Sequence, residues 1–343
     1  WGDKDYEMPP KKKLPASIIA DFRTWIEMGA PDPRRGTLAK AEVKEIDFEQ
    51  ARKFWSFRKP SEPALPNVND SAWPREDLDC FILSQLEENG LRPATPADRR
   101  TLIRRATYDL TGLPPTVAEI EAFLADKSPN AFSKTVERLL ASPHYGEKWG
   151  RHWLDVARYA DSNGLDENLA YVNAFRYRNY VINSFNEDKP YNRFVQEQIA
   201  GDLLPLSKNE SDELRHSQLI ATGFLSVGAK MLAEDDGRKM EMDIIDEQLD
   251  TLGRAFMGMT IGCARCHDHK FDPIPTRDYY SLAGIFKSTH TMDNHKVVAQ
   301  WHEVELGSAD LRAKRELVDK EVKKQKQTIE SLKSKSAKSQ SAK

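Results

Sequence analysis

The sequence predicts a mostly α-helical protein. Apolar residues recur at helical spacing in successive segments, and alternating β-branched runs, which would indicate strands, are few. Of the 343 residues, 39% are hydrophobic and 31% are charged, which is within the range of a soluble globular protein. The formal net charge of −3 does not indicate nucleic acid or an anionic membrane as a partner. No apolar run approaches the ~20 residues of a membrane span.

The first segment, residues 1–36, contains a Met-Pro-Pro turn and a short helical pattern. Apolar residues recur at helical spacing from Ile18 to Ile26, and Gly29 and Pro31 end the pattern. A helix of about two turns is too small to fold alone. Because the sequence starts at a Trp and not at an initiator Met, we interpret it as a piece of a longer protein.

A proline-rich linker is expected at residues 37–75, and a larger helical domain at residues 76–300. Within this domain the apolar pattern predicts helices at 77–89, 97–110, 116–125, 132–141, 145–160, 172–186, 191–200 and 239–258. A stripe that includes Trp149 and Trp153 is expected to lie in the core. Cys80, beside an apolar face, is expected to be a free and partly buried thiol.

Residues 301–343 are predicted to form a charged, coiled-coil-like helix with a frayed end. The a and d positions of one heptad register are occupied by Leu311, Val318, Val322, Ile329 and Leu332. This seam predicts packing on another chain or domain, and thus a helix-mediated oligomer. A solvated single helix is the alternative, because Arg315 and Gln325 occupy two seam positions.

Cys263, Cys266 and His267 form a C-x-x-C-H motif, which is the attachment signature of haem c. On one helical turn the two cysteines project on the same side, where they can form thioethers with the two vinyl groups of one porphyrin edge. The imidazole of His267 then becomes the proximal ligand of the iron. Its other ring nitrogen is expected to bond to a backbone carbonyl, such as one in the turn 272–275, or to the carboxylate of Asp268 or Asp272. The motif therefore predicts one covalent haem c in this chain, and a redox protein outside the cytoplasm.

Other interpretations of the motif fit less well. A structural zinc site needs four ligands, and with Cys80 distant the only set is a cramped quartet that adds His269 to the motif. A thioredoxin-like pair needs a βαβ context, which the sequence lacks. His269 is expected to be a propionate partner, a supporting hydrogen-bond partner or a surface residue. The sequence does not choose the distal ligand among His152, His290, His295, Met231, Met240, Met242, Met257 and Met259.

Several long runs resemble the planctomycete-type cytochrome c-associated domain, a domain of unknown function. The similar runs are RRATYDLTGLPPT (104–116), YGEKWGRHWLDVARYADSNG (145–164), QEQIAGDLLP (196–205) and the run 246–286 around the motif. The resemblance covers roughly residues 50–300 and includes the C-x-x-C-H motif.

Residues 1–36 resemble the end of the planctomycete-type cytochrome c domain that precedes this domain in such proteins. There the methionine of the Met-Pro-Pro turn is a distal haem ligand, a role that the resemblance assigns to Met8. The C-x-x-C-H partner of that methionine is absent from the sequence. A second haem is therefore expected only where the upstream cytochrome half is present.

The resemblance also implies an exported protein, often encoded near enzymes that process sulfated or complex polysaccharides. We expect a periplasmic or otherwise extracytoplasmic electron-transfer protein, acting as the haem part of an oxidoreductase for carbohydrate-derived substrates. Its partner would be a redox protein or the adjoining domains of the same precursor. The alternatives are a haem enzyme with an open distal site, and a structural or glycan-binding protein in which haem stabilises the fold.

Overall fold

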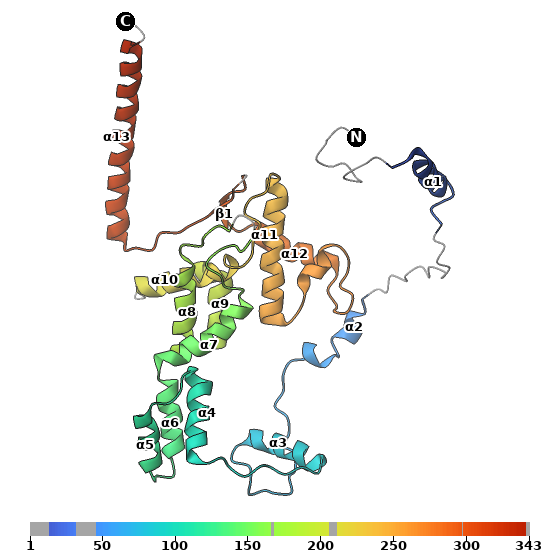
Figure 1. Cartoon of the computed structure of the whole chain (residues 1–343), viewed down its shortest axis with the longest axis vertical. Helices are drawn as coiled ribbons and strands as arrows, with labels where there is room; N and C mark the ends of the chain where they lie inside the picture. Colours follow the sequence, from blue (N-terminus) through green and yellow to red (C-terminus); the bar gives the residue numbers. More distant parts are fainter. Residues whose placement is uncertain (1–13, 32–45, 166–167, 206–210, 297, 341–343) are drawn as a thin grey trace. The chain divides into compact units, whose positions relative to one another are not determined.

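The computed structural model describes residues 14–31, 46–165, 168–205, 211–296 and 298–340 (Figure 1). Contacts divide the chain into two compact units, Trp1–Asp47 and Phe48–Lys343. In the described residues the regular structure consists of thirteen α-helices, a few short 3-10 and π turns and one two-stranded sheet. The prediction of a mostly α-helical protein is confirmed.

The first unit contains one described helix, α1 (Ala16–Glu27), at the predicted place. None of its residues is buried, and Phe22, Trp25 and Ile26 are exposed. The indole of Trp25 donates a hydrogen bond to the carbonyl of Pro31, 2.9 Å away, which closes the turn after the helix. Met8 lies outside the described residues.

The second unit holds the other helices and the sheet. Its α-helices are α2 (Phe48–Ala51), α3 (Asp77–Glu88), α4 (Arg99–Thr111), α5 (Val117–Ala125), α6 (Ala131–Leu140), α7 (Pro143–Val156), α8 (Ala174–Asn186), α9 (Tyr191–Ala200), α10 (Asp212–Ala221), α11 (Gly237–Leu252), α12 (Thr276–Lys287) and α13 (Ala309–Gln340). Short turns lie at η2 (Trp55–Phe57), η3 (Gly201–Leu203), η4 (Thr222–Leu225), η5 (Gly253–Met257) and η6 (Ile261–Arg265). Each predicted helix has a counterpart, whereas α2, α10 and α12 were not predicted.

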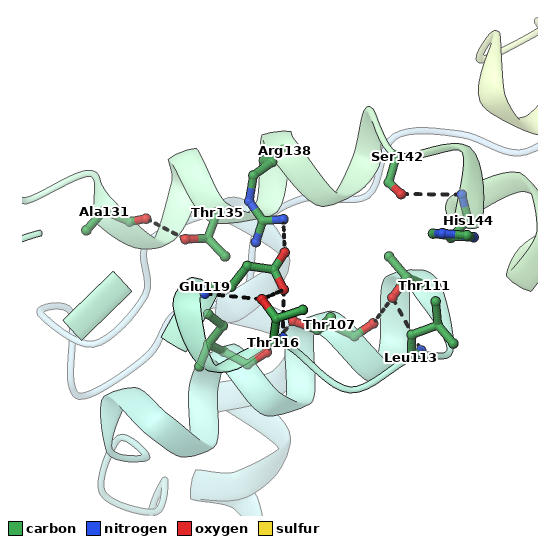
Figure 2. Close-up of polar contacts among 11 residues, drawn as sticks. Thr107, Thr111, Leu113, Thr116, Glu119, Ala131, Thr135, Arg138, Ser142 and His144 are labelled. Carbon is green, nitrogen blue, oxygen red and sulfur yellow. Dashed lines mark hydrogen bonds and ion pairs between the residues drawn. The ribbon is translucent and has the colours of Figure 1, made fainter. Parts of the chain in front are cut away.

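Local polar contacts define the ends of the helices from α4 to α7 (Figure 2). Gly112 ends α4 in the left-handed conformation, with φ of 72°. Thr116 and Glu119 form a capping box at the start of α5, and Ser142 accepts a hydrogen bond from a backbone N–H at the start of α7. Arg138 of α6 pairs with the carboxylate of Glu119, which ties α6 to α5.

The largest buried cluster joins helices α7 to α10. Tyr177, Val181, Phe194 and Phe224 are its main buried side chains, and Trp153 packs against it. The expected tryptophan stripe is therefore only partly internal, because Trp149 is more than a third exposed.

A second cluster joins α11 to α12 and to η6 through Leu249, Ile261 and Tyr279. A third cluster joins α11 to the sheet through Ile244 and Met292. Helix α11 thus packs in both cores, through Ile245 and Leu249 in the second cluster and Ile244 in the third.

The sheet is an antiparallel hairpin of β1 (Met292–Asn294) and β2 (Gln300–Trp301). Met292 pairs with Trp301 and Asn294 pairs with Gln300, so the register shifts between the two pairs. Asp293 is the additional residue on β1, as in a β-bulge.

Helix α13 carries the predicted heptad seam. All five seam residues that the sequence assigned to a and d positions are exposed. Lysine and acidic side chains four residues apart pair along the helix, as Lys314 and Asp310 do at 2.9 Å. No helix of the described chain has the length and apolar character that crossing a membrane requires.

Candidate functional site

The C-x-x-C-H motif lies on and directly after the 3-10 turn η6. The backbone N–H of Cys263 donates to the carbonyl of Thr260 at 3.1 Å, and Cys266 caps the end of the turn. With three residues per turn, residues i and i+3 of a 3-10 turn lie one above the other. Cys263 and Cys266 therefore leave the same side of the turn, and both are free and exposed.

Two glycines shape the chain that leads to the motif. Helix α11 continues into the π turn η5, and Gly258 then ends this turn in the left-handed conformation, with φ of 65°. A Cβ at Gly253 would lie only 2.7 Å from the carbonyl oxygen of Met259 and from Cγ1 of Ile261. The chain can therefore fold back closely onto the end of α11 and place η6 beside that helix. Single π turns inside helices are frequent at functional sites.

Side chains of two helices hold the motif in place. The guanidinium of Arg265 lies 2.9 Å from a carboxylate oxygen of Asp243 and 3.1 Å from one of Asp246, both on α11. The hydroxyl of Tyr280, on α12, donates to the carbonyl of Arg265 at 3.1 Å. The hydroxyl of Tyr279 donates to Asp246 at 2.6 Å, and burial together with this hydrogen bond raises the pKa of Tyr279. The turn that carries the cysteines is thus fixed between α11 and α12.

His267 is exposed, and one of its ring nitrogens has a partner in the backbone. Nδ1 lies 2.8 Å from the carbonyl oxygen of Asp268, so Nδ1 carries the hydrogen and donates it. Nε2 is then the nitrogen with a free lone pair. The carboxylate of Asp268 accepts from the backbone N–H of Thr276 at 2.8 Å, which connects this residue to the start of α12. The partner of His267 is a backbone carbonyl, as expected, but it belongs to the next residue and not to the turn 272–275.

His269 supports the loop after the motif. Its side chain is 6% exposed. Nδ1 accepts hydrogen bonds from the backbone N–H groups of Asp272, at 2.8 Å, and Phe271, at 3.3 Å, while Nε2 lies 2.9 Å from the hydroxyl of Thr260. Both ring nitrogens are therefore occupied, Nδ1 by the loop and Nε2 by Thr260 at the start of η6. Of the three roles expected for His269, this arrangement matches that of a supporting hydrogen-bond partner.

The apolar residues before the motif are mostly used in packing. Leu249 is buried, and Leu252 and Met259 pack on the same cluster. Met257 and Phe271, which flank the motif in sequence, are 45% and 83% exposed. Both of these apolar side chains are therefore exposed rather than used in the core.

The distal-ligand candidates lie in different places. Met240 is fully buried in the hairpin core, Met242 packs against the core around α12, and Met231 is partly exposed. His152 packs its ring against Trp149, with centroids 5.4 Å apart. Met257 ends the turn η5, and Met259, between η5 and η6, packs against the core around α12.

The hairpin carries a cluster that the sequence did not indicate. His290, Asp293 and His302 place one ligand atom each within 4.8 Å of one another. Asp293 also lines an open pocket of about 430 Å³, together with Tyr171, Trp301 and six further residues. None of these lining residues belongs to the motif. The ligands are spread over thirteen residues without a short motif, so only the hairpin pairing could have indicated them.

Residues 77–291 match the PSCyt2 family, described as a protein of unknown function (DUF1549), and its name is that of a planctomycete cytochrome-associated family. The match covers more than half of the chain, which therefore belongs to this family. It includes the C-x-x-C-H motif and ends before Asp293 and His302. No curated protein and no solved structure matches the chain.

Proposed function

We propose that this member of the PSCyt2 family binds one haem c covalently through Cys263 and Cys266, with His267 as the proximal iron ligand, and transfers electrons outside the cytoplasm. The observation that carries the proposal is the arrangement of the motif. Two exposed thiols leave one side of a fixed tight turn, and an exposed imidazole follows them directly.

The thiols fit thioether formation. A porphyrin can reach only accessible sulfur atoms, and both motif cysteines are exposed, whereas Cys80 on α3 is half-buried. The anchoring of Arg265 to Asp243 and Asp246 would keep the two sulfur atoms in register with one porphyrin edge.

The imidazole of His267 fits an iron ligand. Donation from Nδ1 to the Asp268 carbonyl fixes the tautomer in which Nε2 is free, which is the usual arrangement of a metal-bound histidine. When bound, the haem would supply one-electron redox chemistry at the iron. Asp268 and the start of α12 would hold the ring orientation, since they are joined by the hydrogen bond from Thr276.

Electron transfer suits this site better than catalysis at the iron. The motif is at the surface, and the described pocket is lined by other residues. A porphyrin edge at the surface can approach a partner directly, whereas a haem enzyme needs an enclosed distal site for its substrate. The proposed partner is a redox protein or an adjoining domain, within a periplasmic oxidoreductase for carbohydrate-derived substrates.

The test is to produce the protein in a host with cytochrome c maturation and to count covalent haems. The pyridine spectrum of the denatured protein and its intact mass should both give one haem per chain. An apoprotein mass in such a host, with the cysteines free, would refute the proposal. In the native spectrum, a six-coordinate low-spin iron supports electron transfer and a five-coordinate iron supports the haem-enzyme alternative.

The role of Met8 needs the longer precursor. If the upstream cytochrome half carries its own C-x-x-C-H motif, the full-length protein should contain two haems. The Met8→Ala substitution should then lower the potential of only one of them, because it removes a thioether ligand that favours ferrous iron. A full-length protein with a single haem would contradict this assignment.

A further inference from the structure

The base of the hairpin brings two histidines onto one carboxylate. Nδ1 of His302 lies 2.7 Å from Oδ1 of Asp293, and Nε2 of His290 lies 3.3 Å from the same oxygen. The two imidazole rings lie at 85° to each other, with centroids 4.4 Å apart. All three side chains are exposed, so a dissolved ion can reach them.

The fold brings His302 to the other two residues, which are three apart in sequence. The backbone N–H of His302 donates to the carbonyl of Thr291 at 2.9 Å, which extends the strand pairing and sets His302 beside β1. Asp293 is the additional residue where the register shifts. Bulges of this kind redirect a side chain and are common next to active sites.

Two imidazoles and one carboxylate are a recurring ligand set for divalent first-row metals. They suit zinc in sites that keep an open position, and non-haem iron in sites that bind a substrate or oxygen. Three protein ligands leave at least one coordination position for water or an oxygen donor. The three ligand atoms already lie within 4.8 Å of one another, so small shifts would suffice to bring them to one ion.

The neighbouring pocket gives such an ion a place to act. Asp293 is both a member of the cluster and part of the pocket lining. The rings of Tyr171 and Trp301 and the polar side chains of Gln300 and Glu303 line the same space. Aromatic faces combined with a few polar groups are typical of sites for small organic molecules.

We propose that His290, Asp293 and His302 bind one divalent transition-metal ion of the zinc class at the edge of this pocket, with a coordination position open to an oxygen ligand. The proposal does not depend on haem at Cys263 and Cys266. It predicts a second chemical centre in the chain, on a different segment from the C-x-x-C-H motif.

The test is a calorimetric titration of the chelator-treated, otherwise intact protein with Zn²⁺. The protein should bind one Zn²⁺ per chain at this site, and His290→Ala, Asp293→Asn and His302→Ala should each weaken binding by roughly tenfold or more, because even outer partners of metal ligands contribute about that much. The matched control is His144→Ala. His144 is an exposed histidine that also pairs with a carboxylate, that of Glu147, at 2.7 Å, and its removal should leave Zn²⁺ binding unchanged.

Two results would overturn the proposal. One is the absence of stoichiometric Zn²⁺ binding, which would mean that the three residues form only hydrogen bonds. The other is binding that Cys263→Ala removes and the hairpin variants do not, which would place the ion at the C-x-x-C-H motif. Circular dichroism of each variant shows that the fold is retained, as expected for exposed side chains.

Discussion

The motif turn and the hairpin differ in how their chemistry is encoded. The motif turn has its reactive groups within five consecutive residues, from Cys263 to His267. The hairpin brings His302 to His290 and Asp293 only through strand pairing. The reactive groups of the motif turn can be recognised from the order of residues alone, but their anchoring cannot. In the hairpin, the fact that His302 lies beside the other two residues depends on the fold.

Helix α11 connects the two regions energetically. Ile245 packs in the core beneath the motif turn, and its neighbour Ile244 packs in the core beneath the hairpin. Asp243 and Asp246 pair with Arg265 of the motif turn. If the two sites are chemically independent, substitutions in one should leave the other intact, whereas loss of α11 contacts should affect stability as a whole.

The largest effect is expected at the motif cysteines. Cys263→Ala combined with Cys266→Ala should abolish covalent haem, because both thioethers are lost, and Zn²⁺ binding at the hairpin should persist if the variant folds. Cys80→Ala is the matched control and should retain the haem, since that thiol is half-buried on α3. The intact mass of each variant under denaturing conditions shows whether it carries covalent haem. Retention of haem mass by the double variant would show that the motif is not the attachment site.

The next largest effect is expected at the buried ion pair beside the hairpin. Lys230 has a fully buried side chain, and its ammonium lies 2.6 Å from the carboxylate of Glu247 on α11. Arg158 pairs with the same carboxylate, and burial lowers the pKa of Lys230. Glu247→Gln should lower the free energy of unfolding by ~3 kcal/mol, because the buried ends of Lys230 and Arg158 then lose the carboxylate that they share.

Urea denaturation of Glu247→Gln is best compared with that of Glu241→Gln. Glu241 lies on the same helix and pairs with the exposed Lys287 at 3.7 Å. Its removal should change the free energy of unfolding by less than ~0.5 kcal/mol. Equal effects of the two substitutions would mean that the Lys230 pair contributes no more than a surface pair.

A smaller effect is expected at His269. The His269→Ala substitution removes the acceptor for the Asp272 N–H and the contact with Thr260, so the free energy of unfolding should fall by ~2 kcal/mol. The covalent haem and the visible spectrum of the native protein should stay unchanged, since neither nitrogen of His269 is available to iron. Thermal unfolding and the native spectrum measure the two outcomes separately. A changed iron spectrum at an unchanged haem mass would make His269 a ligand after all.

Local signals explain how much of the fold could be predicted. Periodicity identified most helices, because the spacing of apolar residues acts within a few residues. The caps at Gly112 and Thr116, which are also local, were seen only in the structure. Helix α12 follows two prolines and gains its buried face by packing on α11 and η6, so its partners lie outside the short window in which periodicity is read. The strands have three and two residues, too few for an alternating pattern to stand out.

The same contrast holds for the candidate site. The motif residues follow from local sequence, as does the expectation of a backbone carbonyl for His267, but which carbonyl it is, that of Asp268, is seen only in the structure. The salt bridges from Arg265 to Asp243 and Asp246 span about twenty residues and follow only from the fold. The exposure of Trp149, within a stripe expected in the core, shows the same limit, because periodicity gives a face but not what covers it.

The smallest expected effect concerns the hydroxyl of one tyrosine in each region. Tyr279, beneath the motif turn, donates to the carboxylate of Asp246 at 2.6 Å, and Tyr171, at the pocket, donates to the carbonyl of Gly228 at 3.0 Å. Hydrogen bonds to charged groups contribute more than those to neutral groups. Tyr279→Phe should therefore lower the free energy of unfolding by ~2 kcal/mol and Tyr171→Phe by ~1 kcal/mol at neutral pH.

The pH dependence of these two variants provides the sharper test. Burial raises the pKa of both tyrosines above the ordinary value of about 10, and for Tyr279 the bond to Asp246 raises it further. As the pH rises above 10, the unfolded chain loses these protons while the folded chain retains them, so the wild-type protein loses stability. A phenylalanine has no such proton. The difference in the free energy of unfolding between wild type and each variant should therefore decrease between pH 10 and the onset of alkaline unfolding. Urea denaturation at pH 7 and pH 10.5 measures this difference in the free energy of unfolding. If the difference stayed constant with pH, the two hydroxyls would not be held buried and neutral in the folded protein.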